Sequence, residues 1–262
     1  MFLSIRSYIK SIEPITLERS RQLQKDEVVT EQEKSKLRSL IGQLNWITRV
    51  SRPDIGFGVC QLGSTLKNAT VSDLVKANKL LRHVKNTPNS ICFTKFSDLK
   101  NLKVVVYTDA SFANLPNGGS QGGQIVFLAD NCNKSSPLAW ESKKIKRVVK
   151  STLAAETLSF VEGCDLGIFM SKILSEIIGG DNNITIPVTC MTDNKSLYEA
   201  AYTTRVISDT RLRVEMSIVR EMIEKEEVSL SWIKSAEQVA DVLTKDGVSS
   251  TSILNILGNA HL

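Results

Sequence analysis

The chain has 262 residues, enough for one or two domains, and 42% of them are hydrophobic, which allows a sizeable core. Its net charge of +5 permits a polyanionic partner without requiring one. The five cysteines are scattered without a CxxC pair and only two histidines occur, which argues against a disulfide framework, a zinc site and a Ser-His-Asp triad. No window approaches about 18 uncharged apolar residues, and charges interrupt the first apolar segment. We therefore expect no membrane span and no signal peptide.

The first 98 residues are predicted to form a small, mainly helical segment that carries no obvious chemistry. Residues 1–29 show no clear period, and we expect them to be weakly structured. The TEQE motif at Thr30 predicts a capping box with Glu33, and therefore the start of a helix. Apolar residues then recur at helical spacing. Helices are expected from Thr30 to about Ile47, from Pro53 to Leu66 and from Val71 to Lys85.

Residues 99–248 alternate between strand and helix patterns, which predicts an α/β domain with the order βββαβααβα. Short connections among the first three strands predict an antiparallel meander, and we interpret Gly122-Gly123 as part of a turn. Residues 249–262 are expected to be a carboxyl-terminal tail. The expected strands are Leu102–Thr108, Gln124–Leu128, Pro137–Ser142, Ile186–Thr192 and Val228–Ile233, and the expected helices are Ser151–Ile178, Asn194–Tyr202, Thr210–Glu226 and Ala236–Lys245.

Two aspartates follow apolar strand patterns, each in a Thr-Asp pair. Asp109 comes directly after VVVYT and Asp193 directly after VTCMT. If the two strands are parallel neighbours, both carboxylates point into one crevice at the carboxyl ends of the strands. Strands lie about 4.8 Å apart, so the two charges would repel each other unless a positive charge lay between them. The alternative for either residue is a turn aspartate or a helix N-cap.

Two further carboxylates lie in predicted helices. Glu156 falls on an apolar stripe between Leu153 and Phe160, where a carboxylate is rare unless it is paired or binds a metal. The alternative is that it lies at the end of the stripe and reaches solvent. Asp241 falls off the apolar face of its predicted helix, so periodicity alone favours a solvated aspartate there.

An oxygen-only cluster of this kind suits hard cations such as Mg²⁺ or Mn²⁺. Two such ions can activate a water and stabilise the leaving oxygen of a phosphodiester. A basic segment lies just before the Glu156 helix and would complement a phosphate backbone, although a solvated charge run is the usual alternative. Its basic residues are Lys143, Lys144, Lys146, Arg147 and Lys150.

Four motifs in this order together resemble the ribonuclease H domain of copia-type retrotransposon Pol polyproteins. They are YTDASFA from Tyr107, KRVVKSTLAAE from Lys146, TDNKSL from Thr192 and QVADVLTK from Gln238. SRPDIGFGV from Ser51 resembles the segment that joins reverse transcriptase to ribonuclease H in the same polyproteins. The resemblance implies a carboxyl-terminal fragment. Residues 1–98 would be a remnant of the reverse transcriptase thumb and connection, and residues 99–248 a ribonuclease H-like mixed five-stranded sheet with flanking helices.

The resemblance also implies functions for individual residues. Asp109, Glu156, Asp193 and Asp241 would form a catalytic quartet that binds two Mg²⁺ or Mn²⁺ ions. Residues expected near the nucleic-acid backbone are Ser111, Lys144, Lys146, Arg147, Lys150, Ser151, Thr152 and Asn194.

The implied activity is hydrolysis of the RNA strand of an RNA–DNA hybrid. Other Pol segments would be further partners, no membrane is expected, and the sequence does not give an oligomeric state. No YxDD motif occurs, so we expect no reverse transcriptase active site in this chain. We expect the protein in the cytoplasm, with a virus-like particle or the nucleus as alternatives. The alternative function is a catalytically inactive or domesticated nucleic-acid-binding fragment.

Overall fold

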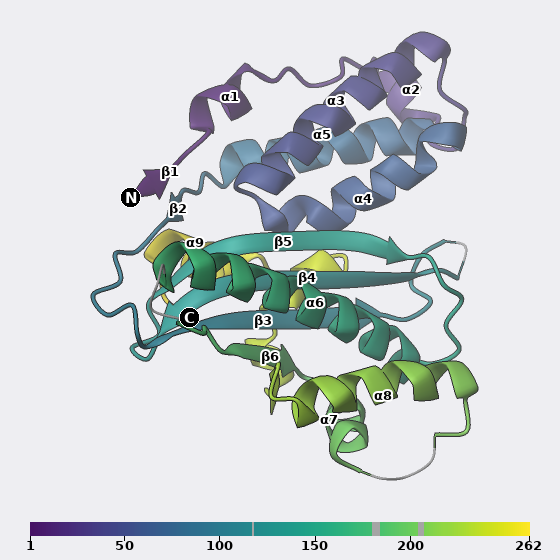
Figure 1. Ribbon diagram of the computed structural model, residues 1–262. Helices are drawn as coiled ribbons and strands as arrows, with labels where there is room; N and C mark the ends of the chain where they lie inside the picture. Colours follow the sequence, from purple (N-terminus) through teal and green to yellow (C-terminus); the bar gives the residue numbers. More distant parts are fainter. Residues whose placement is uncertain (117, 180–183, 204–206) are drawn as a thin grey trace. The chain divides into compact units, whose positions relative to one another are not determined.

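A computed structural model describes residues 1–116, 118–179, 184–203 and 207–262 (Figure 1). The contacts divide the chain into two units. One is Phe2–Ile91 and the other is Met1 together with Cys92–Leu262. This division falls between Ile91 and Cys92, whereas the sequence pattern placed the limit at residue 99. None of the described helices is long and apolar enough to cross a membrane.

The first unit is mainly helical, and its longest helix starts where the sequence predicts. Thr30 accepts a hydrogen bond from the Glu33 backbone and the Glu33 side chain accepts one from the Thr30 backbone, so the capping box is present. The elements of this segment are β1 (Phe2–Leu3), α1 (Arg6–Ser11), α2 (Arg19–Leu23), α3 (Glu31–Val50), η1 (Pro53–Ile55), α4 (Gly56–Thr65), η2 (Leu66–Asn68), α5 (Val71–Asn86) and β2 (Ile91–Cys92).

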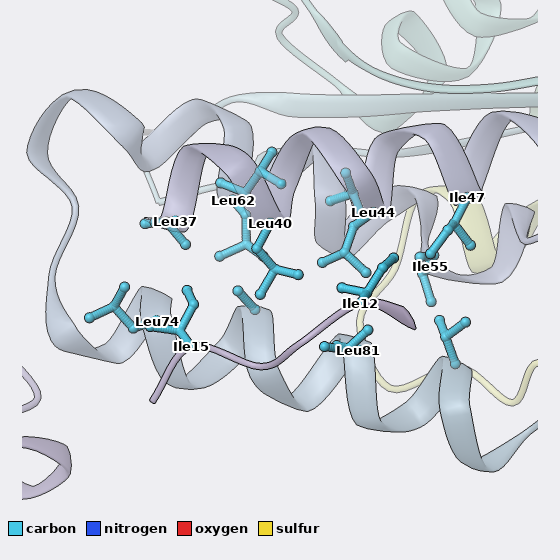
Figure 2. Close-up of a cluster of buried hydrophobic side chains, with 14 of the residues drawn as sticks. Ile12, Ile15, Leu37, Leu40, Leu44, Ile47, Ile55, Leu62, Leu74 and Leu81 are labelled. Carbon is cyan, nitrogen blue, oxygen red and sulfur yellow. The ribbon is translucent and has the colours of Figure 1, made fainter. Parts of the chain in front are cut away.

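The amino-terminal residues belong to the core of this unit, so the expectation of a weakly structured lead-in was wrong. Ile12 and Ile15 are buried against the leucines and isoleucines of α3, α4 and α5 (Figure 2). The Asn78 side chain on α5 both accepts from and donates to the Ile15 backbone, at 2.8 Å in each case. These two bonds satisfy the backbone N–H and C=O of Ile15, which lies outside the helices and strands. Residue periodicity could not reveal such a side-chain partner.

The SRPD part of the joining motif has a structural function within the helical unit. Arg52 is only 1% exposed and forms an ion pair with Asp54, with an Nη2–Oδ2 distance of 2.7 Å. Its guanidinium also donates to the Thr87 carbonyl, at 2.7 Å, and to the Val84 carbonyl, at 3.3 Å. Arg52 therefore satisfies backbone acceptors at the carboxyl end of α5, which is why a buried charge is tolerated there.

The second unit contains a five-stranded mixed sheet, which confirms the predicted fold class. Its strand order is β5-β4-β3-β6-β7. β3 pairs antiparallel with β4, and β4 with β5, whereas β3–β6 and β6–β7 are parallel pairs. The strands are β3 (Leu102–Ser111), β4 (Ser120–Asp130), β5 (Ser135–Ile145), β6 (Val188–Thr192) and β7 (Ser229–Trp232).

The long helix α6 (Thr152–Gly179) lies along this sheet (Figure 1) and makes a close contact through two glycines. A Cβ on Gly167 would lie 2.6 Å from the Val106 side chain, and one on Gly163 would collide with Thr108. The helix therefore approaches β3 more closely than any larger residue would allow. The other described helices of this unit are α7 (Lys195–Tyr202), α8 (Thr210–Glu224) and α9 (Thr251–Asn259), with α8 packed against α6.

The carboxyl-terminal region differs from its prediction in two ways. Instead of a helix at Ala236–Lys245, two short 3₁₀ turns occur, η4 (Ser235–Glu237) and η5 (Val239–Leu243). Gln238 is extended between them, because its side chain accepts from the Ala240 backbone and donates to the Thr108 carbonyl. Beyond them, α9 packs against β5 and buries Ile253 and Leu257, within the region expected to be a tail.

Replacing Gly163 by alanine is expected to destabilise the second unit by about 1–3 kcal/mol, because the added methyl group forces α6 away from β3. Gly42→Ala is the control, since nothing lies within 4 Å of a Cβ there. In mid-helix that change should be neutral or stabilising by up to about 1 kcal/mol. Urea unfolding followed by circular dichroism measures both. Wild-type stability in Gly163→Ala would contradict the close packing.

Candidate active site

Three carboxylates from three different elements converge in the second unit. Asp109 lies in β3, Glu156 in the second turn of α6, and Asp193 directly after β6. One oxygen from each lies within 4.8 Å of the others, and Asp109 and Glu156 are buried. Tyr107 pairs with Met191 in the parallel β3–β6 ladder, so two residues further on Asp109 and Asp193 stand at the same level.

The sequence suggested that Asp109 directly follows the end of its strand, but in the structure Asp109 lies within β3. β3 continues to Ser111 because it pairs with Gly122 and Gln121 of β4. Gly122-Gly123 is therefore part of a strand and not of a turn, which corrects the sequence interpretation. Gly123 stands opposite Asp109 in the ladder, and a Cβ there would lie 2.6 Å from Leu243. This glycine lets the carboxyl-terminal segment reach Asp109, a function that the sequence analysis missed.

Burial and mutual repulsion shift the proton affinity of two members of the cluster. Burial raises the pKa of Glu156 to about 9, and the charges of Asp109 and Asp193 add to this effect. Burial also raises the pKa of Asp109 to about 6, although Lys245 and a hydrogen bond from Thr244 lower it. Without a bound cation, Glu156 therefore keeps its proton at neutral pH. A cation that binds the cluster would displace this proton.

Asp241 is near the cluster but not in it. Its carboxylate pairs with Lys245, with an Oδ1–Nζ distance of 2.6 Å, and the same Nζ lies 3.3 Å from Asp109 Oδ1. The side chain of Asp241 is 20% exposed. This exposure is intermediate between that of the solvated aspartate favoured by periodicity and that of the buried ligand implied by the resemblance. Lys245 belongs to the QVADVLTK motif, but the sequence analysis gave it no role.

Two other residues of the same motif hold the aspartates in place. The Thr244 hydroxyl donates to the Asp109 carboxylate. The Gln238 amide donates to the Asp193 carboxylate at 3.5 Å and to the Thr108 carbonyl at 2.9 Å. Both side chains are buried, so their polar groups depend on these partners. Their position next to Asp241 in the motif was the signal that could have revealed them.

The residues predicted to lie near nucleic acid separate into internal and exposed groups. Ser111 is buried and its hydroxyl donates to the Thr244 carbonyl at 2.8 Å. Ser151 accepts from the Ala154 backbone, and Asn194 is the N-cap of α7, where its side chain accepts from the Leu197 backbone. Those three side chains therefore have partners within the protein. Lys144, Lys146, Lys150, Arg147 and Thr152 are exposed.

Two of these exposed basic residues line a groove. Arg147, which pairs with Glu215, and Lys150 line a cavity of about 540 Å³ between the segment before α6 and the start of α8. Val148 and Val214 contribute apolar walls and are 80% and 57% exposed. The groove therefore combines cations with an apolar surface near the amino-terminal end of the helix that carries Glu156.

Fold and site together define an α/β protein with a buried carboxylate cluster at the carboxyl ends of neighbouring parallel strands. In sequence, the chain is similar to the retrovirus-related Pol polyprotein from transposon RE1 of Arabidopsis thaliana, at 26% identity over 220 residues. It is equally similar to that from transposon TNT 1-94 of Nicotiana tabacum, at 26% over 210 residues. A transposon Ty5-1 protein of Saccharomyces cerevisiae is 34% identical over 114 residues.

The resemblance to copia-type Pol polyproteins is thereby confirmed over most of the chain. The matches cover 83% of this chain for RE1 and 79% for TNT 1-94, but the chain spans only 14% and 15% of those polyproteins. The solved ribonuclease H1 of Halobacterium salinarum is 18% identical, with a TM-score of 0.38 over 54% of this chain and 94% of that one. No protein-family profile matches the chain.

The cluster predicts a pH-dependent stability in the absence of divalent cations. The pKa of Glu156 is about 9 in the folded protein, against an ordinary value of 4.5. Folding thus favours the protonated carboxyl. Its contribution to the free energy of unfolding is complete below about pH 4.5 and is lost as the pH rises through 9. The free energy of unfolding should fall over this range, and Glu156→Gln should flatten the fall.

Glu176→Gln serves as the control, because Glu176 is exposed on the same helix. Urea titrations at a series of pH values, with a chelator present, measure the slope. The same slope in wild type and Glu156→Gln would show that the Glu156 proton does not couple to folding.

Proposed function

We propose that this chain is a ribonuclease H-type endonuclease that cleaves the RNA strand of RNA–DNA hybrids by two-metal hydrolysis, as part of a retrotransposon Pol polyprotein. The observation that carries the proposal is the convergence of Asp109, Glu156 and Asp193 on one small volume. The substrate follows from the resemblance of the four site motifs to copia-type ribonuclease H domains. The sequence similarity to Pol polyproteins covers the same region.

The donor set suits the proposed cations. All three convergent groups are carboxylates, and no cysteine or histidine is among them, which favours Mg²⁺ or Mn²⁺ over softer metals. The raised pKa of Glu156 indicates a site with an excess of negative charge that a divalent cation would neutralise. When bound, such ions would lower the pKa of a water and stabilise the leaving oxygen.

The protein's own residues would supply the orientation that this chemistry needs. Asp109, Glu156 and Asp193 would hold the ions, and Asp241 would be the fourth ligand. Thr244 fixes one oxygen of Asp109, and Gln238 fixes one of Asp193. Such outer hydrogen bonds set the direction of the carboxylates and so the position of whatever they bind. Asp109 and Glu156 are buried, which limits the access of water to these two carboxyl groups.

Asp109→Asn tests the proposal directly. We expect a fall of at least about a hundredfold in the rate of hybrid cleavage with Mg²⁺, because losing one ligand charge removes several kcal/mol of transition-state stabilisation. Asp246→Asn is the matched control, since Asp246 is exposed and lies outside the cluster. Gel analysis of a labelled hybrid, with duplex DNA in parallel, gives the rates. Equal cutting by wild type and Asp109→Asn would refute the site.

A second candidate is a nucleic-acid-binding module without cleavage, and the exposed lysines before α6 favour it. Lys144, Lys146 and Lys150 are all exposed on the segment that directly precedes the helix of Glu156. This candidate predicts salt-sensitive binding to the hybrid and no metal-dependent products. The Asp109→Asn assay separates the two candidates, because only the enzyme loses product formation.

The basic segment should contribute to binding under either candidate. Replacing Lys146 and Lys150 together by alanine should weaken hybrid binding at low salt and reduce the slope of log affinity against log salt by up to about 2, since each phosphate contact contributes roughly 0.9. Lys172→Ala, farther along α6 and exposed, is the control. Fluorescence anisotropy in a salt series, with a chelator to prevent cleavage, measures both. An unchanged slope would place the hybrid elsewhere.

A further inference from the structure

A lysine lies on one side of the acidic site. Lys245 Nζ is 2.6 Å from Asp241 Oδ1 and 3.3 Å from Asp109 Oδ1, so one ammonium group bridges the two carboxylates. Among the described residues, no ion pair of a lysine or arginine to Glu156 or Asp193 occurs, although both lie in the same cluster. The positive charge is therefore placed on one side of the site only.

The position of this ammonium is built into the backbone. The Lys245 N–H donates to the Asp241 carbonyl at 3.0 Å, which sets the lysine one turn beyond its partner. The preceding Thr244 is anchored to Asp109 through its hydroxyl, and Leu243 lies against the β4 backbone at Gly123. The lysine side chain is itself 39% exposed, so its flexible stem has a path to solvent.

A divalent ion cannot share this position with the ammonium. Mg²⁺ binds carboxylate oxygens at about 2.0–2.1 Å, so an ion that joined Asp109 to Asp241 would overlap Nζ, which lies 2.6 and 3.3 Å from the same oxygens. An ion held by Asp109, Glu156 and Asp193 would not have to displace a bridging lysine. The two halves of the acidic site are thus not equivalent.

We propose that Lys245 is a built-in counter-cation that occupies the second cation position, between Asp109 and Asp241, in the metal-free protein. The first divalent ion binds to Asp109, Glu156 and Asp193 beside the lysine. The second binds only when Lys245 moves out to solvent, and it therefore binds more weakly. This inference rests on the proposed function for the existence of the cation site, but it concerns a residue to which that function assigns no task.

Counting bound Mn²⁺ by electron paramagnetic resonance, at near-physiological salt and without substrate, tests the inference. Wild type is expected to bind one ion tightly and a second more weakly. Lys245→Met should tighten the second ion by at least about tenfold, because the competing charge is gone. Lys245→Arg keeps the charge and should keep the second ion weak. Asp241→Asn should lose the second ion and retain the first.

Lys195→Met is the matched control. Lys195 is two residues from Asp193 and pairs with Glu199 instead of Asp109 or Asp241. The Lys195→Met variant removes the same charge near the site. Both Mn²⁺ affinities should stay within about twofold of wild type, because exposed charges are screened. Circular dichroism establishes that each variant is folded. If Lys245→Met does not fold, Lys245→Gln takes its place with the same expectation.

The inference is overturned if Lys245→Met, or Lys245→Gln in its place, binds the second ion with wild-type affinity. It is also overturned if Lys195→Met tightens that ion equally, since the effect would then be one of net charge. If either of these outcomes is found and wild-type protein still cleaves the hybrid, the role of Lys245 fails but the proposed function stands. If wild type neither binds Mn²⁺ nor cleaves, the proposed function fails with it.

Discussion

The parallel pairing of β3 with β6 is the constraint on which the site depends. These strands are far apart in the sequence, and their register brings Asp109 and Asp193 to the same level of the sheet. The two carboxylates then share a crevice at the carboxyl ends of the strands, where α/β proteins collect their ligands. α6 adds Glu156 to this crevice from above the sheet, and its glycines allow the approach. Three carboxyl groups are thus forced together by packing that is otherwise apolar.

That arrangement has an electrostatic cost that the rest of the site offsets. Buried carboxylates this close together favour protonation, as the raised pKa values of Glu156 and Asp109 indicate. The segment after β7 stabilises the aspartates Asp109 and Asp193 with an ammonium from Lys245, a hydroxyl from Thr244 and an amide from Gln238. The carboxyl-terminal turns are therefore as much a part of the site as the strands.

The strands and most of the helices follow from local patterns. The capping box at Thr30, the helix from Thr152 and the strand before Asp193 all lie where periodicity predicted them. The failures have a common cause, because each involves a partner distant in the sequence. Gln238 breaks the expected last helix by bonding to β3, and the first residues gain structure only by packing on α3 and α5.

The sequence by itself determined the order of the five sheet strands and of the helices between them, the candidate carboxylates Asp109, Glu156 and Asp193, and the resemblance that linked Asp241 to them. It could do so because hydrophobic periods and short motifs are local properties of the chain. Only the tertiary structure decided which oxygens converge, that Asp241 stands apart from the other three, and that Lys245 lies between two of the four carboxylates. Those facts depend on strand register and on side-chain directions across segments more than 100 residues apart, which no local pattern encodes.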